Sequence, residues 1–328
     1  PDPNYNRNFY ESCDWIGCIS KQTFGIVNRV GKSKESITYK PLQDWQIKYV
    51  PHGINPDVFK PTQVSDKVKN LIFGGKEYEF IIFFNNRNIR RKKPSDVIYA
   101  YNNFCEQLPL DKANKCLLLM HTTAIDDNGT DLFAVKEALC PKYDVKINDN
   151  KILQGELNEI YNLVDCTINI SNNEGFGLTT AESIMSGTPV IVNVTGGLQD
   201  QCGFNIDGKE FSEFDYIKYG SLHNKKKWDM ISHGDWSIPI WSSSQTLNGS
   251  PVTPYIFDDN LNLDDVTDAM MRMYNLGKEQ RKKNGIKGRE WALKNLSSKN
   301  MCDKMIEGIE TCFNNFKKRE KFDLYKIV

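Results

Sequence analysis

Short apolar stretches alternate with amphipathic stretches along the middle of this chain. Runs such as FIIFF and CTINI have the length of buried strands, and the segments between them repeat apolar residues at helical spacing. The expected strands are 15–19, 47–50, 80–84, 115–120, 143–147, 166–170 and 190–194. The expected helices are 20–31, 95–107 with Ser95 as N-cap, 131–139, 156–163, a helix after Gly177, 263–274, 278–293 and 298–317. This alternation predicts an α/β fold with a Rossmann-like, doubly wound parallel sheet.

The stretch from Leu198 to Thr253 follows neither period. It contains several aromatic residues and the run GDWSIPIWSSSQTLNGSP. More than about fifty residues without regular structure are unusual in a compact domain, and such loops are often functional or mobile. We therefore expect residues 198–253 to form a long irregular insertion.

Composition excludes several classes of protein. The 328 residues include 42 Lys+Arg and 42 Asp+Glu, so there is no net charge to attract nucleic acid as the main partner. No apolar run is long enough to predict a membrane span. The nine cysteines include no C-x-x-C pair, which argues against a disulfide framework or a zinc site. A reducing compartment, and hence a cytoplasmic location, is expected.

The run SNNEGFGLTTAESIMSGTP, residues 171–189, carries the clearest chemistry. A strand leads into the turn Glu174-Gly175-Phe176-Gly177, and a helix follows. Unpaired N–H groups at a helix start favour an anion, and glycines let it approach the backbone. Glu174 and Glu182 lie on either side of this turn, where their carboxylates can accept hydrogen bonds from sugar hydroxyls. The segment is thus suited to a phosphate that bears sugar groups. An ordinary βα unit with surface glutamates is the alternative.

A second charged segment follows the strand 80–84 and contains Arg87, Arg90, Arg91, Lys92 and Lys93. Fixed cations stabilise the charge that a leaving diphosphate gains as its bond breaks. Parallel strands place their carboxyl ends at one edge, so this loop and the glutamate turn should share one crevice. A solvated basic loop, or an RNA contact, is the alternative interpretation.

These motifs together resemble those of retaining glycosyltransferases of the GT-B fold, family 4 in particular. E-G-F-G-L-x-x-x-E matches the E-x7-E signature, and Arg87 and Lys92 keep the spacing of the family's Arg/Lys pair. Residues 50–61, VPHGINPDVFKP, resemble the family's crossover between its two domains. Asn86, Lys93 and Pro94 depart from the family pattern, which puts the local turn in doubt.

The resemblance implies roles for individual residues. Glu174 would contact the donor sugar, Glu182 the ribose, and Arg87 and Lys92 the diphosphate. Backbone groups at Gly175–Leu178 and the Thr179 hydroxyl or amide would complete the donor site. The nucleotide base would lie near Ile152 and Leu153. No cofactor and no metal would be needed, because the substrate is a nucleotide-diphosphate sugar of the UDP or GDP type and the Arg/Lys clamp replaces the metal.

The resemblance also implies a domain division. Residues 1–50 would be the end of an N-terminal, acceptor-side domain, a remnant of a second Rossmann-like unit whose greater part lies outside this sequence. Residues 51–62 would be the crossover and 63–297 the donor-binding domain. Residues 298–328 would form a helix that crosses back to the first domain.

The expected function is that of a retaining, metal-independent glycosyltransferase that moves a hexose from a nucleotide-diphosphate sugar to a hydroxyl of a glycan, lipid or protein. A nucleotide-sugar binding module without turnover, and a GT-B epimerase or phosphorylase, are the alternatives. Three further features remain ambiguous. His121 either lines the crevice or is a plain loop residue, Gly196-Gly197 is either part of the donor site or a plain turn, and Asp126, Asp127 and Asp131 are expected to be a solvated acidic loop.

Overall fold

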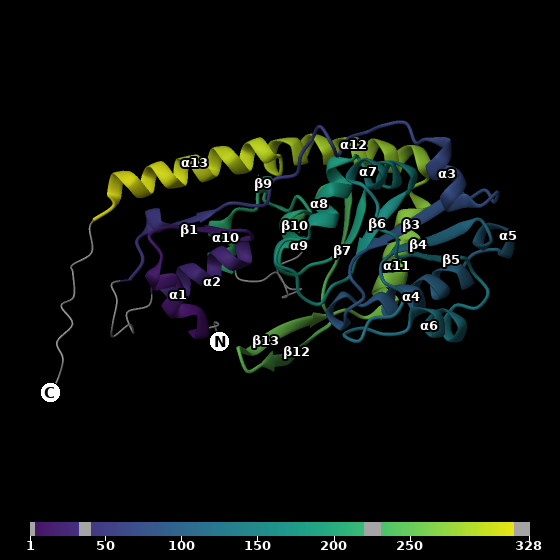
Figure 1. The fold of residues 1–328 in the computed structure, drawn as a ribbon, viewed down its shortest axis with the longest axis horizontal. Helices are drawn as coiled ribbons and strands as arrows, with labels where there is room; N and C mark the ends of the chain where they lie inside the picture. The colour runs from purple at the N-terminus through teal and green to yellow at the C-terminus, as the bar shows by residue number, and fades with distance from the viewer. Residues whose placement is uncertain (1–3, 33–40, 220–230, 318–328) are drawn as a thin grey trace.

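The computed structural model describes residues 4–32, 41–219 and 231–317 (Figure 1). Its centre is a six-stranded sheet in the order β11-β7-β6-β3-β4-β5, in which every neighbouring pair is parallel. The strands are β3 (Phe80–Asn85), β4 (Cys116–His121), β5 (Val145–Asn148), β6 (Cys166–Asn169), β7 (Val190–Asn193) and β11 (Ser237–Ile240). The predicted doubly wound parallel sheet is confirmed.

Side chains of each central strand alternate between two hydrophobic cores. Ile81 and Phe83 belong to one core, and Phe80, Ile82 and Phe84 belong to the other. The first core includes α3 (Asp66–Phe73), α7 (Gln154–Leu163), α8 (Leu178–Met185) and α12 (Lys278–Asn295). The second includes α4 (Pro94–Glu106), α5 (Leu110–Ala113), α6 (Leu132–Leu139) and α11 (Leu263–Asn275). Helices therefore cover both faces, which explains why the strands read as continuous apolar runs.

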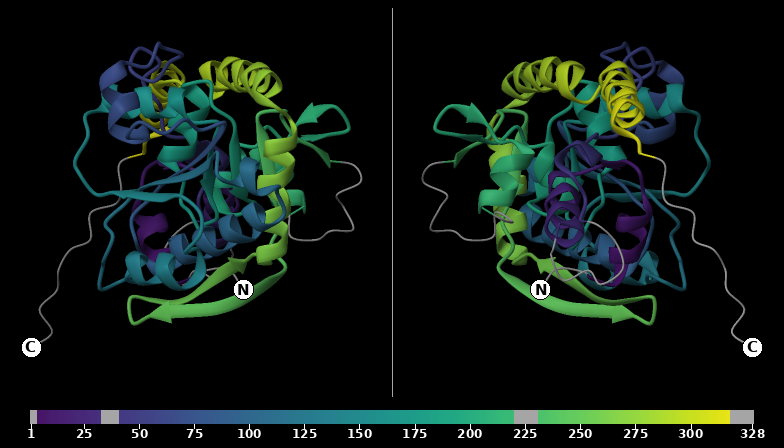
Figure 2. Two further views of the ribbon diagram at one scale, coloured as in Figure 1. Left: turned by 90° about the vertical axis from the view of Figure 1, so that its right-hand side faces the viewer. Right: turned by 90° about the vertical axis from the view of Figure 1, so that its left-hand side faces the viewer.

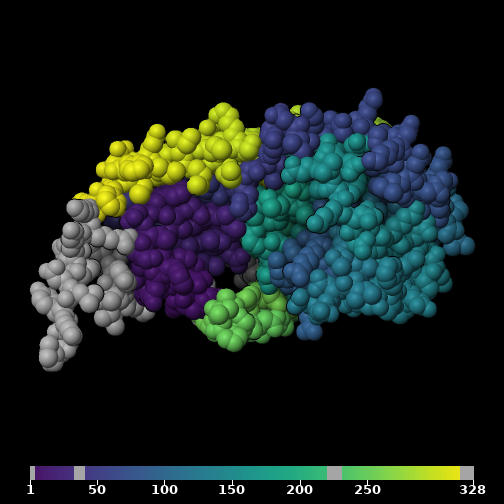
Figure 3. Space-filling model, viewed as in Figure 1, coloured from purple at the N-terminus to yellow at the C-terminus, as the bar shows by residue number. Residues whose placement is uncertain are grey.

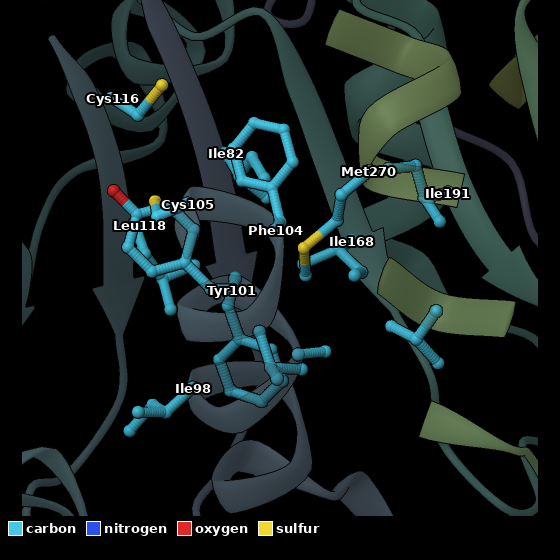
Figure 4. Close-up of a cluster of buried hydrophobic side chains, with 14 of the residues drawn as sticks. Ile82, Ile98, Tyr101, Phe104, Cys105, Cys116, Leu118, Ile168, Ile191 and Met270 are labelled. Atoms are coloured by element: carbon cyan, nitrogen blue, oxygen red, sulfur yellow. The ribbon is translucent and has the colours of Figure 1, made fainter. Parts of the chain in front are cut away.

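Figure 4 shows part of the second core. Ile82, Leu118, Ile168 and Ile191 project from four neighbouring strands toward Ile98, Tyr101, Phe104 and Cys105 of α4 and Met270 of α11. The interlocking of these side chains fixes the sheet, and with it the ends of the strands from which the polar loops leave.

The strand order reverses between β3 and β6. From β3 the chain proceeds through β4 to β5 on one side, and from β6 it proceeds through β7 to β11 on the other. Crevices that bind ligands in open α/β sheets form at such a switch point, beyond the carboxyl ends of the strands. The Arg87 loop follows β3 and the Glu174 turn follows β6, so the topology brings these two segments together.

A smaller unit lies beside this sheet (Figure 1). It contains η1 (Asn4–Asn6), α1 (Arg7–Ser12), β1 (Ile16–Cys18), α2 (Lys21–Gly31), η2 (Asp44–Gln46) and β2 (Ile47–Tyr49). β1 and β2 pair in parallel over a small core of its own. The long helix α13 (Ser298–Asn315) runs across this unit, where Glu307 pairs with Lys48. The division into two domains remains a prediction.

The expectation of an irregular insertion at 198–253 is wrong. The segment begins within α9 (Gly196–Asp200) and contains β8 (Asn205–Ile206), β9 (Lys209–Glu210), α10 (Glu213–Tyr219), β10 (Ile231–Ser232), β11 and β12 (Ser244–Ser250), which pairs with β13 (Thr253–Asn260). Residues 220–230 lie outside the described part. β11 has Pro239 and pairs only with β7, an edge position that tolerates proline. Every residue of β12 is exposed, so no apolar alternation marks it.

The start of α4 also differs from the prediction. Pro94 occupies the first turn, and Lys93 precedes it with φ 57° instead of Ser95 acting as N-cap. Proline is pre-organised for the first helical position, which moves the helix start ahead of the serine. Among the described residues, no helix is both long and apolar enough to cross a bilayer. All nine cysteines are unpaired.

Figure 2 shows where the later elements lie relative to the sheet. The helices α12 and α13 run along one side of the molecule, and the hairpin β12–β13 projects on the opposite side. Tyr255 on this hairpin stacks edge-on against Tyr5 at the N-terminal end of the smaller unit, with ring centroids 5.1 Å apart. The hairpin therefore links the sheet to the smaller unit below the cavity described next.

Candidate functional site

A cavity of about 640 Å³ lies at the switch point. Its walls come from the loops that follow β3, β4, β5 and β6, together with Ile19 and His52 from the smaller unit and the crossover. In the space-filling view the molecule is hollowed where the smaller unit, the β12–β13 hairpin and the sheet meet (Figure 3). The cavity thus lies where the topology predicts a ligand crevice.

Most of the predicted site residues meet in this cavity. Arg87, Lys92 and Glu174 line it, and so does the whole turn from Gly175 to Thr179. They come from two loops that are separated by more than eighty residues in the sequence. The shared crevice predicted for the two loops is present.

Three of the predicted residues do not line this cavity, namely Ile152, Leu153 and Glu182. Leu153 is 76% exposed at the start of α7, and Ile152 packs against the first hydrophobic core. Asp149 lines the cavity from the same loop instead. Ile152 and Leu153 therefore do not line this cavity, because the isoleucine packs against the core and Leu153 is exposed at the start of α7. The Glu182 carboxylate accepts a hydrogen bond from the buried Tyr161 hydroxyl at 2.9 Å.

Charges converge on Glu174. Its carboxylate contacts the ammonium of Lys92, and Arg91 Nη1 lies 3.4 Å from the same oxygen. Burial, followed by the nearby Arg91 charge, lowers the pKa of Lys92 to about 7, while contact with the Glu174 carboxylate favours the charged ammonium. Lys92 and Glu174 thus line the cavity as an ion pair rather than as separate charges.

Arg87 approaches the cavity from a more exposed position. Its Nε lies 3.3 Å from Asp126 Oδ2, and the backbone N–H of Asn128 is the main cause that lowers the pKa of Asp126. Asp131 caps α6 by accepting from the N–H of Phe133 at 2.9 Å. Asp126 therefore accepts within its own turn and pairs with Arg87, whereas Asp131 caps α6.

The glycine turn forms an open helix start. Gly177 precedes α8 with φ +94°, a conformation that favours glycine, and no side chain caps the helix. The first residues of α8, Leu178 and Thr179, line the cavity, and the first N–H groups of a helix have no partner within it.

Three cavity-lining residues carry buried polar atoms that lack partners. They are the Thr179 hydroxyl, the Thr122 hydroxyl and the side-chain nitrogen of Asn86, none of which has a hydrogen-bond partner among the described residues. Buried polar groups in folded proteins are almost always hydrogen-bonded, and each exception needs an explanation. These three atoms are therefore available to a polar ligand in the cavity.

Gly196 and Gly197 pack against the backbone of the turn that begins at Glu174. The Gly197 N–H donates to the Glu174 backbone oxygen at 3.0 Å. A Cβ on Gly196 would lie 1.9 Å from that oxygen, and Gly196 has φ +46°. The glycine pair begins α9, is buried and does not line the cavity. It allows close approach to the backbone of Glu174.

Sequence reasoning singled out neither Asn85 nor Thr122, and it favoured a plain loop role for His121. All three line the cavity. The signal that could have identified them is position, because Asn85 and His121 are polar residues at the carboxyl ends of otherwise apolar strands β3 and β4.

The fold is that of GT-B glycosyltransferase structures. Residues 67–209 match the family model of glycosyl transferases group 1. A trehalose synthase of Pyrococcus horikoshii is 33% identical over 118 residues, which are 35% of this chain and 27% of the relative.

Solved structures share the fold over nearly the whole chain. A glycosyltransferase from Rickettsia africae aligns with TM-score 0.64 and 15% identity over 96% of this chain and 68% of its own. Sucrose-phosphate synthase from Thermosynechococcus elongatus gives TM-score 0.63 and 16% identity over 94% and 61%. Anabaena HepE, solved with UDP and glucose, gives 0.63 and 12% over 93% and 65%. The chain spans about two thirds of the length of these structures, and the aligned segment spans about a quarter of the trehalose synthase.

Proposed function

We propose that this chain binds a nucleotide-diphosphate sugar of the UDP or GDP type and transfers its hexose to a hydroxyl of a glycan, lipid or protein. The observation that carries the proposal is the cavity wall on which Arg87, Lys92 and Glu174 meet the open start of α8 and its unpartnered Thr179 hydroxyl. Cations and helix N–H groups suit a diphosphate, and a carboxylate suits sugar hydroxyls. HepE, a structural relative, was solved with UDP-glucose, which supports the donor class.

The proposed transfer proceeds with retention and without a metal. The bond between the sugar C1 and the diphosphate oxygen breaks while a bond between C1 and the acceptor oxygen forms on the same face. The proton of the acceptor hydroxyl passes to the leaving diphosphate oxygen. Arg87, Lys92 and the N–H groups of α8 stabilise the negative charge that gathers on that oxygen, which is the role a metal ion plays in other transferases.

Calorimetric titration with UDP, GDP and ADP, and then with their sugar conjugates, tests the proposal. We expect saturable binding of UDP or GDP. Arg87→Ala should weaken it about tenfold to a hundredfold, because a hydrogen bond to a charged group contributes roughly 1.5–3 kcal/mol. Arg90→Ala is the matched control, because Arg90 is an exposed arginine of the same loop that does not line the cavity. Absence of binding to every nucleotide, or equal losses in the two variants, would contradict the proposal.

Glu174 and Glu182 should differ in what they recognise. Glu182→Ala is expected to weaken binding of the free nucleotide and of the sugar nucleotide alike, because its proposed partner is the ribose. Glu174→Ala should weaken binding only when the sugar is present. Titration of both variants with UDP and UDP-glucose measures the difference, and equal losses for the free nucleotide would overturn these roles.

A binding module without turnover is the second candidate, since the chain spans only part of its solved relatives. Release of UDP from UDP-sugar in the presence of candidate acceptors distinguishes the two. Turnover by this chain excludes the binding module, whereas tight binding without turnover favours it.

A further inference from the structure

The β12–β13 hairpin adds little to the hydrophobic cores. None of its described residues belongs to any of the three cores, and every residue of β12 is exposed. Its large apolar side chains Leu247, Val252 and Phe257 also remain exposed. A two-stranded hairpin is only marginally stable by itself in water. Contacts at its two ends therefore hold it in place, and those at its base involve the segment that leads into Glu174.

Asn172 joins this segment to the base of the hairpin. The backbone N–H of Asp259 donates to the Asn172 carbonyl oxygen at 2.9 Å, and the Asn172 side-chain amide donates to Asn260 Oδ1 at 3.0 Å. The backbone N–H of Asn172 donates in turn to the carbonyl oxygen of Arg91 at 2.8 Å. Asn172 therefore connects β13 and the basic loop to the turn that begins at Glu174.

The next residue, Asn173, is held by two charged groups. Its side-chain amide donates to the buried Asp258 carboxylate, whose other oxygen accepts from the Asn248 amide across the hairpin. Its carbonyl oxygen accepts from Nη1 of Arg91 at 2.9 Å, and the same nitrogen lies 3.4 Å from the Glu174 carboxylate. Hydrogen bonds that involve an ionised group are stronger than neutral ones. Asp258 and Arg91 together therefore fix the residue directly before Glu174.

Asp258 also interacts with the charge of Arg91. Both residues line a cavity of about 210 Å³ between the basic loop and the hairpin. Burial lowers the pKa of Arg91, and the charge of Asp258 acts in the opposite direction. The guanidinium is therefore shared between the Asp258 and Glu174 carboxylates. A change at Asp258 consequently reaches Glu174 through Arg91 as well as through Asn173.

We propose that Asp258 is a positioning residue for Glu174, and that the β12–β13 hairpin thereby determines where the donor sugar is bound. No residue of the hairpin lines the cavity that Glu174 lines, so the hairpin acts through Asn173 and Arg91. The inference rests on the proposed function, in which the Glu174 carboxylate contacts the donor sugar. Functional groups must be held to within about 0.5 Å of their productive position, and hydrogen bonds from residues behind them provide that precision.

Calorimetric titration of Asp258→Ala with UDP and with UDP-glucose tests the proposal. The affinity for UDP should be unchanged, because the residues proposed to bind the diphosphate stay in place. The affinity for UDP-glucose should fall about tenfold, less than the roughly hundredfold loss that a displacement of about 1 Å can cause, because the bond from Arg91 to the Asn173 carbonyl remains. Asn173→Ala removes the other partner of the same hydrogen bond and should give the same pattern. Asn173 is only half-buried, so this second variant decides the question if the loss of Asp258 affects folding.

A double variant distinguishes positioning of Glu174 from a general structural role. In Glu174→Ala the proposed sugar contact is already lost, so the addition of Asp258→Ala should cause no further loss of affinity for UDP-glucose. Two independent effects would instead add. Asp258→Asn should recover part of the affinity that Asp258→Ala loses, because its amide can still form a hydrogen bond with Asn173 when the side chains turn over. Additive losses in the double variant would overturn the proposal.

Asp235→Ala is the matched control. Asp235 is an exposed aspartate that pairs with Lys287 at 2.5 Å. It precedes β11 and therefore lies at the amino edge of the sheet, whereas the cavity lies at the carboxyl edge. This variant should bind UDP and UDP-glucose as the unmodified protein does. Equal losses for UDP and UDP-glucose in Asp258→Ala, or no loss for either, would overturn the positioning role.

Hydrogen exchange followed by mass spectrometry tests the hairpin contact without any ligand. In Asp258→Ala, the peptide that covers residues 171–177 should exchange faster, whereas peptides from the buried strand β3 should exchange as in the unmodified protein. Failure of the unmodified protein to bind any nucleotide would overturn the proposed function, while the exchange of residues 171–177 still reports whether β13 fixes the turn. Normal binding of UDP-glucose by Asp258→Ala together with unchanged exchange of these residues would overturn the positioning role alone.

Discussion

Lys92→Met is expected to abolish nearly all transfer while leaving the fold intact. The methionine keeps most of the buried stem of the side chain but removes the ammonium that contacts Glu174 and lines the cavity. Groups that stabilise charge developing in the transition state typically contribute about a hundredfold to a thousandfold to the rate. The loss should fall mainly on turnover, because the leaving diphosphate gains charge only as the sugar bond breaks.

The release of UDP from UDP-sugar, with and without acceptor, measures this loss. Lys93→Met is the matched control. Lys93 is the next residue, has an ion pair with Asp96 at 3.5 Å and does not line the cavity. A methionine at position 93 meets the same left-handed backbone as the lysine it replaces, so it adds no new strain. If the two variants lose activity equally, the loop acts through its overall charge rather than through Lys92.

Lys92→Met also leaves Glu174 with a single cationic partner. Arg91 Nη1 remains 3.4 Å from the carboxylate and donates to the Asn173 carbonyl at 2.9 Å, so the turn keeps an anchor. We therefore expect the far-ultraviolet circular dichroism of the variant to match that of the unmodified protein. A loss of helical signal would mean that Lys92 is needed for folding, and the turnover result would then say nothing about the diphosphate.

The sequence predicted the sheet well because its strands are buried on both faces. Phe80–Phe84 reads as an unbroken apolar run, and such runs occur where helices cover both sides. Cys166–Asn169 is also fully buried although it contains Thr167 and Asn169. Arg87, Lys92 and Glu174 line one cavity, because their loops leave neighbouring strands at the switch point, whereas Glu182 lies within α8 and does not line it. Features that depend only on neighbouring residues in the sequence were therefore predictable.

Features that depend on distant partners were not predictable in the same way. β11 is recognisable as a strand only through its pairing with β7, and the exposed β12–β13 hairpin has no apolar alternation. Ile152 and Leu153 follow the cavity-lining Asp149 by only three and four residues, yet they lie outside the cavity at the start of α7. Hydrogen bonds link Glu182, Tyr161, Asn85 and His121, which come from α8, α7, β3 and β4. No spacing in the sequence predicts that these four side chains lie close together.

Gly196→Ala is expected to remove donor binding although position 196 does not line the cavity. The added Cβ would lie 1.9 Å from the backbone oxygen of Glu174, far inside contact distance, and backbone cannot move aside as a flexible side chain can. The residue also has φ +46°, where an alanine costs roughly 1 kcal/mol or more. The Glu174 turn must therefore shift, which would break the hydrogen bond from the Gly197 N–H and move the carboxylate away from Lys92.

Gly208→Ala distinguishes the effect of the collision from the effect of the backbone strain. Gly208 has φ +76°, but a Cβ there would meet nothing within 4 Å, so this variant carries backbone strain without a collision. Titration with UDP-sugar should show near-normal affinity for Gly208→Ala and a loss of at least a hundredfold for Gly196→Ala, since a displacement of about 1 Å in a positioned group can cost that much. Normal affinity in Gly196→Ala would mean that the turn can relax without displacing the carboxylate. Glu174 would then not need its present position to hold the donor, and its proposed contact with the sugar would have to be abandoned.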